Sequence, residues 1–298
     1  MKIVLFGKNG QLGWELQRSL SCLGELVLLG RGDPGGDLND LEALARTVRG
    51  HAPDVIVNAA AYTAVDKAET DIVLAHTINA LAPGVLAREA ARSGALLVHY
   101  STDYVFDGSG EQPWCELDDT GPLSLYGKTK LDGEEVVRAS GCKHLIFRTS
   151  WVYAARGGNF AKTILRLAQE RDSLSVINDQ FGAPTGADLL ADVSAHAIRM
   201  AVDHPHDGSI SGLYHLAAGG ETTWHGYASF VIAYAREAGI DIKLAPDALV
   251  AVPTSAFPLP APRPKNSRLD TGKLQKTFDL RLPEWQSGVT RMLMEVLG

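Results

Sequence analysis

A glycine-spaced turn directly after the first apolar segment constrains the fold more than any other feature of the chain. The stretch KIVLFGKNGQLG, residues 2–13, reads as a buried strand, a turn that contains Gly7, Gly10 and Gly13, and the beginning of a helix. Glycine allows the positive φ of a tight turn and a close approach of helix to sheet, and the exposed amides of the helix N-terminus can meet an anion. We therefore predict that this unit opens a dinucleotide-binding fold and that its glycines contact the cofactor.

Short apolar runs alternate with helical patterns over the first half of the chain. Strands are predicted at residues 2–6, 25–29, 54–61, 95–101 and 144–150. Helices are predicted at residues 11–21, 40–50, 72–94 and 125–139, and Pro83 is expected to kink or interrupt the third of them. Such alternation is typical of parallel strands joined by crossover helices. The predicted fold class is α/β: a Rossmann-like, doubly wound parallel sheet with a smaller mixed α/β lobe that binds the substrate.

The regular alternation loosens at about residue 150, and six prolines fall between residues 246 and 268. A chain of 298 residues is long enough for two lobes. We expect a dinucleotide-binding domain at residues 1–150, joined by residues from about 186 to 204, and a substrate-binding lobe at residues 151–185 and 205–298.

The composition argues against several classes of protein. The net charge is −7, so no chain-wide basic field favours nucleic acid or an anionic membrane. No apolar run approaches the ~18 residues of a membrane span, and the N-terminus lacks the pattern of a secretory signal. Three scattered cysteines without a CxxC pair indicate a reducing compartment. We expect a cytoplasmic protein that binds neither nucleic acid nor membrane.

Polar side chains gather in HYSTDYVF and YGKTK. Thr102 and Asp103 follow the predicted strand at 95–101, whereas Tyr126 and Lys130 lie four residues apart on one helix face. A lysine cation near a phenol lowers the phenol pKa from ~10 toward working pH. Such a tyrosine can exchange a proton with a carbonyl or alcohol while a nicotinamide exchanges hydride. The YxxxK spacing alone is common in helices, but its combination with the glycine turn favours catalysis.

The end of the second predicted strand bears on the choice of dinucleotide. NAD sites usually place an acid there for the ribose hydroxyls, whereas an arginine accommodates the 2′-phosphate of NADP. Here Gly30 stands where an acid is expected and Arg31 follows, which favours NADPH, although a solvated loop arginine explains Arg31 equally well. Asp37 and Leu38 are candidates to flank the adenine.

Eight segments, taken together and in order, resemble the dTDP-4-dehydrorhamnose reductase family, a branch of the extended short-chain dehydrogenases/reductases. The resemblance covers nearly the whole chain, in GKNGQLGWELQ, NAAAYTAVDKAE, HYSTDYVFDG, YGKTKLDGE, FRTSWVY, NFAKTILRLA, INDQFGAPT and RPKNSRLDTGKL. It implies reduction of the C4 keto group of dTDP-4-dehydro-L-rhamnose with hydride from NADPH or NADH, the last step of dTDP-L-rhamnose synthesis for cell-surface polysaccharide. Because the family often has Asp at the position of Gly30, its absence here supports NADPH or dual use.

The resemblance also assigns residues. It implies a catalytic triad of Thr102, Tyr126 and Lys130. It implies cofactor contacts by Gly10, Gln11, Leu12, Asp37, Leu38, Ala61, Tyr62, Thr63, Tyr100, Tyr126 and Lys130. It implies contacts to the sugar nucleotide by Thr102, Asp103 and Trp151. The late basic loop adds Arg263 and Arg268 as candidates for the substrate diphosphate, because guanidinium groups suit phosphate; a solvated proline loop is the alternative.

Members of the family can form homodimers with magnesium held by acidic residues. By this resemblance Glu15, Asp188 and Glu295 are the candidate ligands, against the simpler reading of exposed helix carboxylates. We expect a homodimer and no catalytic metal.

Two other functions stay open. In 4,6-dehydratases the segment after this strand resembles TDE. This chain has TDY there, with Tyr104 at the third position, which counts against dehydration. An epimerase shares the triad, and so its reaction is not excluded. Proteins of this architecture also bind dinucleotides without catalysis as regulatory subunits, although the complete triad favours an enzyme.

Overall fold

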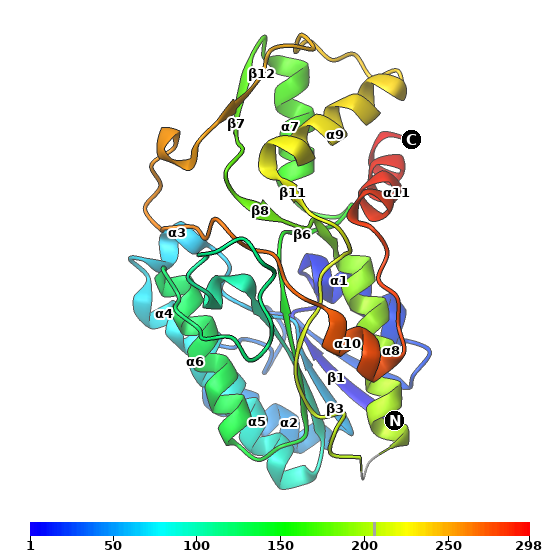
Figure 1. Cartoon of the computed structure of the whole chain (residues 1–298). Coiled ribbons are helices and arrows are strands. Elements are labelled where there is room, and N and C mark those ends of the chain that lie inside the picture. Colours follow the sequence, from blue (N-terminus) through cyan, green and yellow to red (C-terminus); the bar gives the residue numbers. More distant parts are fainter. Residues whose placement is uncertain (205–206) are drawn as a thin grey trace.

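In the part of the chain that the structure describes, parallel strands form one central sheet with the order β2-β1-β3-β4-β5-β10 (Figure 1). The computed structural model describes residues 1–204 and 207–298, so the expected boundary at 204 adjoins residues outside the description. The strands are β1 (Lys2–Phe6), β2 (Glu25–Leu29), β3 (Val55–Asn58), β4 (Leu96–Thr102), β5 (His144–Thr149) and β10 (Gly212–His215). The winding direction reverses between β1 and β3, and ligands of such sheets bind beyond the carboxyl ends of the strands at that point.

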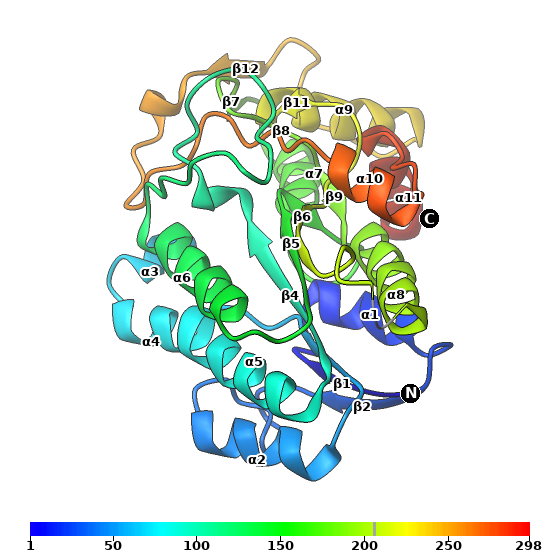
Figure 2. The ribbon, with the colours of Figure 1, turned by 60° about the horizontal axis from the view of Figure 1, so that its bottom comes forward.

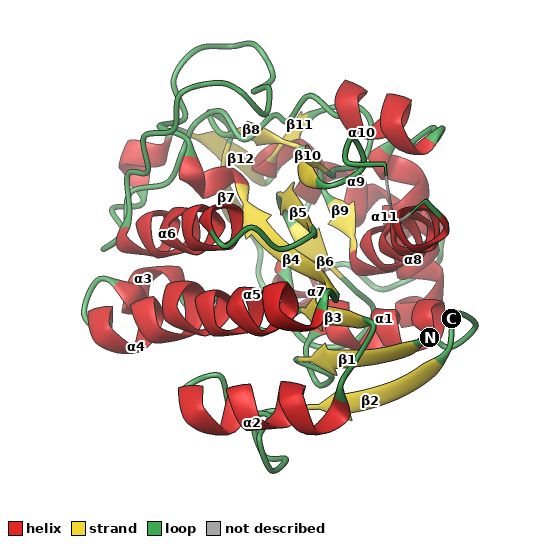
Figure 3. Cartoon of the chain, turned by 90° about the horizontal axis from the view of Figure 1, so that it is seen from below, coloured by secondary structure: helices red, strands yellow, loops and turns green. Residues whose placement is uncertain are grey.

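Helices cover both faces of the sheet, as Figure 3 shows. This cover explains the continuous apolar strands, because every residue of the inner strands β3 and β4 is buried on one face of the sheet or the other. One face carries α1 (Gln11–Leu20), α8 (Ala187–Asp203) and α10 (Gly272–Phe278), and the other carries α2 (Leu41–His51), α5 (Ala82–Ser93) and α6 (Leu125–Ala139) (Figure 2). Leu16 and Leu190 belong to the first core and Leu44 and Leu86 to the second. The predicted fold class is confirmed.

The predicted helix at 72–94 is continuous but contains a wide turn. It consists of α4 (Ile72–His76), the π-helical turn η1 (Thr77–Leu81) and α5, with Pro83 in the first turn of α5. A proline has no amide hydrogen to donate, and the π turn shifts the hydrogen-bond register just before it. The proline therefore interrupts the regular register without ending the helix.

A second lobe lies above the carboxyl ends of the strands (Figure 1). Its helices are α7 (Phe160–Glu170), α9 (Trp224–Glu237) and α11 (Trp285–Leu297). Its short strands are β6 (Val152–Tyr153), β7 (Leu174–Ile177), β8 (Phe181–Gly182), β9 (Thr185–Gly186), β11 (Thr222–Thr223) and β12 (Leu249–Val252), paired as β6–β9, β7–β12 and β8–β11. The three helices share a separate apolar core.

Part of the stretch assigned to the second lobe belongs to the large sheet instead. β10, within the predicted lobe range 205–298, pairs with β5 as the edge strand, and α10 packs beside α8. A four-residue strand carries too little pattern to be assigned to one sheet or another from sequence. The remaining short elements are α3 (Val65–Ala68), η2 (Asp103–Val105) and η3 (Thr254–Ala256). Within the described residues, no helix has the length and apolarity needed to cross a membrane.

Candidate active site

The glycine turn has the shape of an anion cradle. Gly7 has φ +90°, and a Cβ at Gly13 would lie 2.0 Å from the carbonyl oxygen of Gly7. A Cβ at Gly10 would meet, among the described atoms, only that oxygen, at 3.5 Å. Gly10 also caps α1, and within the described residues no side chain bonds to this cap, whereas the buried Oε1 of Gln11 has no partner. Open space and free donors at a helix N-terminus fit a pyrophosphate.

The end of β2 carries mixed charges rather than an acid on the strand. Asp33 folds back, and its Oδ2 accepts from the Gly30 amide at 2.7 Å. The same oxygen lies 2.6 Å from Nζ of Lys8. Arg31 is 79% exposed, 3.6 Å from Oδ2 of Asp37. Sequence reasoning missed Lys8, because the turn was interpreted from its glycines and not from the residues between them.

An asparagine of the π turn holds the loop after β3. Asn79 accepts from the Tyr62 amide at 2.9 Å and donates to the Tyr62 carbonyl at 3.1 Å and to the Thr129 hydroxyl at 3.1 Å. The predicted cofactor residues Ala61, Tyr62 and Thr63 therefore sit in a fixed loop beyond the carboxyl end of β3, beside α6. The π turn was not predictable, and Asn79 was missed with it.

The structure brings Thr102, Asp103 and Tyr126 together beyond the end of β4. The Thr102 hydroxyl donates to Oδ1 of Asp103 at 3.0 Å, and Thr102 lies close enough to the Tyr126 phenol to lower the pKa of that phenol. Tyr104 packs edge-on against Tyr126, with ring centroids 5.5 Å apart. Ser124 caps α6 by accepting from the Gly127 amide, which fixes the start of the helix that carries Tyr126 and Lys130.

Burial sets the protonation state of Tyr126. Burial, and to a smaller extent the charge of Asp103, raise the pKa of this phenol to about 12, while Thr102 opposes the rise. The expectation that Lys130 lowers this pKa toward neutrality is wrong, because burial dominates and Lys130 is not among the groups that shift the pKa of Tyr126. A protonated phenol at neutral pH is the form that a proton donor requires.

Lys130 is buried one helical turn after Tyr126 on α6. Its Nζ donates to the Tyr100 carbonyl at 2.6 Å and lies 3.5 Å from Nε2 of His99, whose Nδ1 is 3.2 Å from Nδ2 of Asn58. Burial lowers the pKa of Lys130 to about 8, with Glu134 opposing. The Tyr100 hydroxyl instead bonds to Ser194 of α8, at 2.6 Å. Tyr100 therefore offers its backbone to this site and its ring to the core.

Unpartnered polar atoms line the ends of β4 and β5. Among the described residues, Oδ2 of Asp103 and the hydroxyls of Ser101, Thr149 and Ser150 are buried without a hydrogen-bond partner. Such groups are rare in proteins and indicate a surface completed by a polar ligand. Burial raises the pKa of Asp103 to about 6, with bonds to Ser267 and Thr102 opposing. Sequence reasoning missed Ser267, which stands between the two flagged arginines.

Trp151 lies at the edge of the second lobe with φ +47°. It stacks on Trp224, with ring centroids 3.7 Å apart, and a Cβ at Gly182 would lie only 2.8 Å from the Trp151 ring. Its ring is half-buried. The ring is thus held in one orientation at the lobe boundary, beside Gln180, which accepts from Nε1 of Trp224 at 3.0 Å.

Arg263 and Arg268, the candidate diphosphate ligands of the late loop, each form an ion pair with a carboxylate of the chain. Arg263 forms a fork with Asp66, at 2.9 and 2.8 Å, which ties the late loop to α3. Arg268 pairs with Glu221 and stacks over Phe181, 4.2 Å from the ring centroid. A substrate phosphate would compete with these two acids.

The candidate magnesium ligands do not converge within one chain. Glu15 lies 3.5 Å from Arg18, while Asp188 and Glu295 each lie 3.6 Å from Arg291. Over the residues that the structure describes, no group of three acidic, histidine or cysteine side chains could hold a metal. One chain therefore does not by itself fit a magnesium ion.

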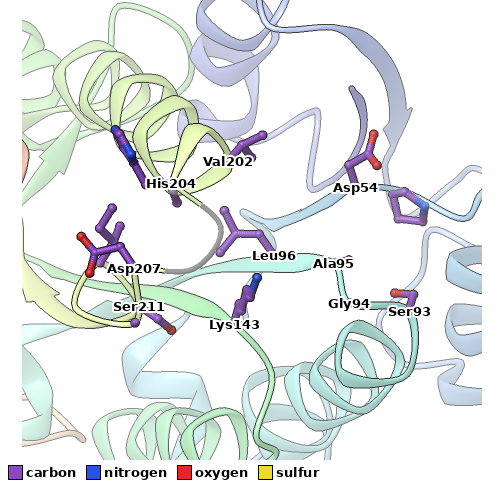
Figure 4. A pocket seen from close by; sticks show the side chains of 14 residues that line it. Asp54, Ser93, Gly94, Ala95, Leu96, Lys143, Val202, His204, Asp207 and Ser211 are labelled. Atoms are coloured by element: carbon purple, nitrogen blue, oxygen red, sulfur yellow. The ribbon is translucent and has the colours of Figure 1, made fainter.

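The cavity in Figure 4 is unrelated to these groups. It measures about 410 Å³ and is lined by Asp54, Gly94, Lys143 and His204 among others. These residues precede β3, β4 and β5 or follow α8, so the cavity lies at the amino ends of the strands. The polar groups described above lie at the opposite, carboxyl ends.

Comparison with known proteins assigns the family. Residues 1–297 match the family model described as RmlD substrate binding domain. The chain is 59% identical over 298 residues to a dTDP-4-dehydrorhamnose reductase of Salmonella typhimurium, covering 99% of this chain and 98% of the relative. Two solved dTDP-4-dehydrorhamnose reductases superpose over 99% of both chains: that of Clostridium acetobutylicum, with TM-score 0.87 and 37% identity, and that of Bacillus anthracis in complex with NADP, with TM-score 0.88 and 32% identity. The chain therefore belongs to the dTDP-4-dehydrorhamnose reductase family.

Proposed function

We propose that this protein reduces the C4 keto group of dTDP-4-dehydro-L-rhamnose to give dTDP-L-rhamnose, with NADPH or NADH as the reductant. The relatives carry this reaction in their name, and the Bacillus anthracis structure holds NADP. The observation that carries the proposal is the proximity of Tyr126 to Thr102 at the carboxyl end of β4, on the same edge of the parallel sheet as the glycine turn after β1. A neutral phenol, a hydroxyl and a buried lysine are the groups that carbonyl reduction needs.

The bound nicotinamide would supply the hydride. Tyr126 donates its proton to the C4 oxygen, which becomes the new hydroxyl. Thr102 hydrogen-bonds the same oxygen, and the Lys130 ammonium stabilises the phenolate left behind. Asp103, ionised above about pH 6, accepts from a sugar hydroxyl. Gly10 and the first amides of α1 hold the pyrophosphate.

The second lobe supplies the remaining substrate contacts in this proposal. Trp151 packs on the sugar, and Arg263 and Arg268 exchange their carboxylate partners for the diphosphate. Residues 1–150 with 186–204 bind the dinucleotide, and much of the rest binds the sugar nucleotide. Charge and composition support a partner that is a small molecule rather than nucleic acid or membrane.

We further propose a cytoplasmic homodimer. Cys22, Cys115 and Cys142 are free thiols in the described chain, which supports a reducing compartment. A magnesium ion bridging two copies through Glu15, Asp188 and Glu295 would have to displace Arg18 and Arg291. Equilibrium sedimentation with and without a chelator tests whether the chain forms a dimer and whether the dimer needs magnesium.

The catalytic test follows NADPH absorbance with enzymatically made dTDP-4-dehydro-L-rhamnose. We expect stoichiometric oxidation with a rhamnosyl product, and a fall in kcat of about 10²- to 10⁴-fold for Tyr126→Phe with little change in dinucleotide Kd. Tyr104→Phe is the matched control, because it removes a neighbouring phenol and keeps the ring contact. Unimpaired turnover by Tyr126→Phe would exclude the assigned proton donor. Dinucleotide binding without any oxidation would favour an epimerase or a regulatory subunit.

A further inference from the structure

Three groups converge where the adenosine ribose of a dinucleotide is expected. The Asp33 carboxylate accepts from the Gly30 amide at 2.7 Å and lies 2.6 Å from Nζ of Lys8. Lys8 comes from the glycine turn, and its Nζ also lies 3.5 Å from the Leu28 carbonyl, on β2. A carboxylate is therefore present at the end of β2, although the strand itself ends without one.

The loop geometry explains why this acid comes from residue 33. A Cβ at Gly30 would lie 2.7 Å from Nδ2 of Asn9, so a side chain there forces the Asn9 amide to move. The Asp33 amide donates to the Gly30 carbonyl at 3.0 Å, and the Gly36 amide donates to the Asp33 carbonyl at 3.0 Å. These turns bring the Asp33 side chain back to the strand end.

The charges of this cluster suit two different ligands. A ribose with free hydroxyls donates hydrogen bonds to a carboxylate, as in NAD sites. A 2′-phosphate is repelled by that carboxylate and attracted by Lys8 and Arg31. The pair is partly exposed, with side-chain exposures of 28% for Lys8 and 35% for Asp33, and exposed ion pairs exchange partners at little cost. Arg31, 79% exposed and loosely paired, is free to turn toward a phosphate.

We propose that the Lys8–Asp33 pair is an exchangeable selector of the dinucleotide. Asp33 accepts the ribose hydroxyls of NADH, whereas Lys8 leaves Asp33 and, with Arg31, binds the 2′-phosphate of NADPH. This inference rests on the proposed binding of a dinucleotide at the glycine turn. On this proposal, the ratio of the Kd values for NADPH and NADH depends on the side chains of Lys8 and Asp33.

The experiment measures Kd for NADPH, NADH and the fragment 2′,5′-ADP by calorimetry. Lys8→Met should raise Kd for NADPH and 2′,5′-ADP by about tenfold or more and change Kd for NADH by less than about threefold. Asp33→Asn keeps an acceptor for the Gly30 amide. It should raise Kd for NADH and lower Kd for NADPH, so that the ratio of the two Kd values moves in the opposite direction from that in Lys8→Met. Lys276→Met on α10 removes the same charge at an exposed position away from β2 and should change neither.

Equal effects of Lys8→Met on both dinucleotides, or an unchanged ratio in Asp33→Asn, would overturn the selector. The failure of the proposed reaction is a separate result. Wild-type protein that binds 2′,5′-ADP through Lys8 but oxidises neither dinucleotide with the keto sugar would retain the selector and reject the reductase.

Discussion

The ammonium group of Lys130 donates a 2.6 Å hydrogen bond to the carbonyl oxygen of Tyr100, the residue two before Thr102 on β4. The contact ties the helix that carries Tyr126 to the strand that carries Thr102. It also leaves a cation almost fully buried, and burial lowers its pKa to about 8. A buried charge kept in place against this cost is typical of a functional group.

We expect Lys130→Met to lower kcat by about 10²-fold or more while the free energy of unfolding near neutral pH stays equal or rises. The folded pKa lies below the unfolded one, so the folded wild type binds fewer protons between about pH 8 and 10.5. Wild-type stability therefore gains with pH across that window, and the variant lacks this gain. Urea unfolding near pH 7 and near pH 10 checks both statements. A variant that loses stability at neutral pH would make Lys130 a structural residue.

Asp103 should give activity and stability opposite responses to acid. Its pKa is raised to about 6, so the carboxylate that we propose accepts a hydrogen bond from the substrate is lost as pH falls through 6. We expect kcat/KM for the sugar nucleotide to fall on that limb. The folded state binds the proton more tightly than the unfolded state, so this residue contributes stability that grows as pH falls from about 6 toward 4.

Asp103→Asn is the control for both limbs. An amide keeps the acceptor for Thr102 but does not titrate, so the acid limb of kcat/KM and the stability gain between about pH 4 and 6 should both disappear. Steady-state kcat/KM and equilibrium unfolding, both measured against pH on the same preparations, decide the matter. If the acid limb persists in the variant, another group titrates and Asp103 does not contact the substrate.

The buried ion pair of Arg148 and Glu134 should be one of the costliest contacts to break. Three hydrogen bonds of 2.9, 3.2 and 2.6 Å join them, and both side chains are at most 2% exposed. Glu134→Gln leaves the guanidinium without its counter-charge and should lower the free energy of unfolding by about 3 to 5 kcal/mol. Glu170→Gln breaks the exposed pair with Arg166 on α7 and should cost about 0.5 kcal/mol or less. Similar losses in the two variants, measured by urea unfolding, would contradict the role of burial.

The sequence predicted the elements, and it predicted that some of the candidate site residues lie together, because those signals are local. The strand, glycine turn and helix at the N-terminus appear where the pattern places them, and Thr102, Asp103 and Tyr126 do meet. Spacing on a helix and position at a strand end are fixed by backbone geometry alone.

Long-range pairings were not readable in the same way. Asp66 takes Arg263, and Ser267 reaches Asp103, across more than a hundred residues of chain. Nothing in the sequence near Arg263 shows that its guanidinium group pairs with a distant carboxylate. The pKa of Tyr126 was also mispredicted, because the sequence shows the neighbouring lysine but not the depth of burial.

The glycine turn allows its binding role to be separated from its folding role. A Cβ at Gly10 meets open space beyond one atom at 3.5 Å among those described, whereas a Cβ at Gly13 lies 2.0 Å from the Gly7 carbonyl oxygen. Gly10→Ala should therefore cost less than about 1 kcal/mol of stability. The added methyl group would stand where we propose that the pyrophosphate approaches, so Kd for the dinucleotide should rise by about tenfold or more.

Gly13→Ala should behave in the reverse way. The methyl group forces α1 away from the turn, and we expect a loss of about 2 kcal/mol or more in the free energy of unfolding. Calorimetric Kd and urea unfolding of both variants give the comparison. If Gly10→Ala binds NADPH as tightly as the wild type, the backbone at Gly10 does not approach the ligand, and the pyrophosphate must be held by another part of the chain.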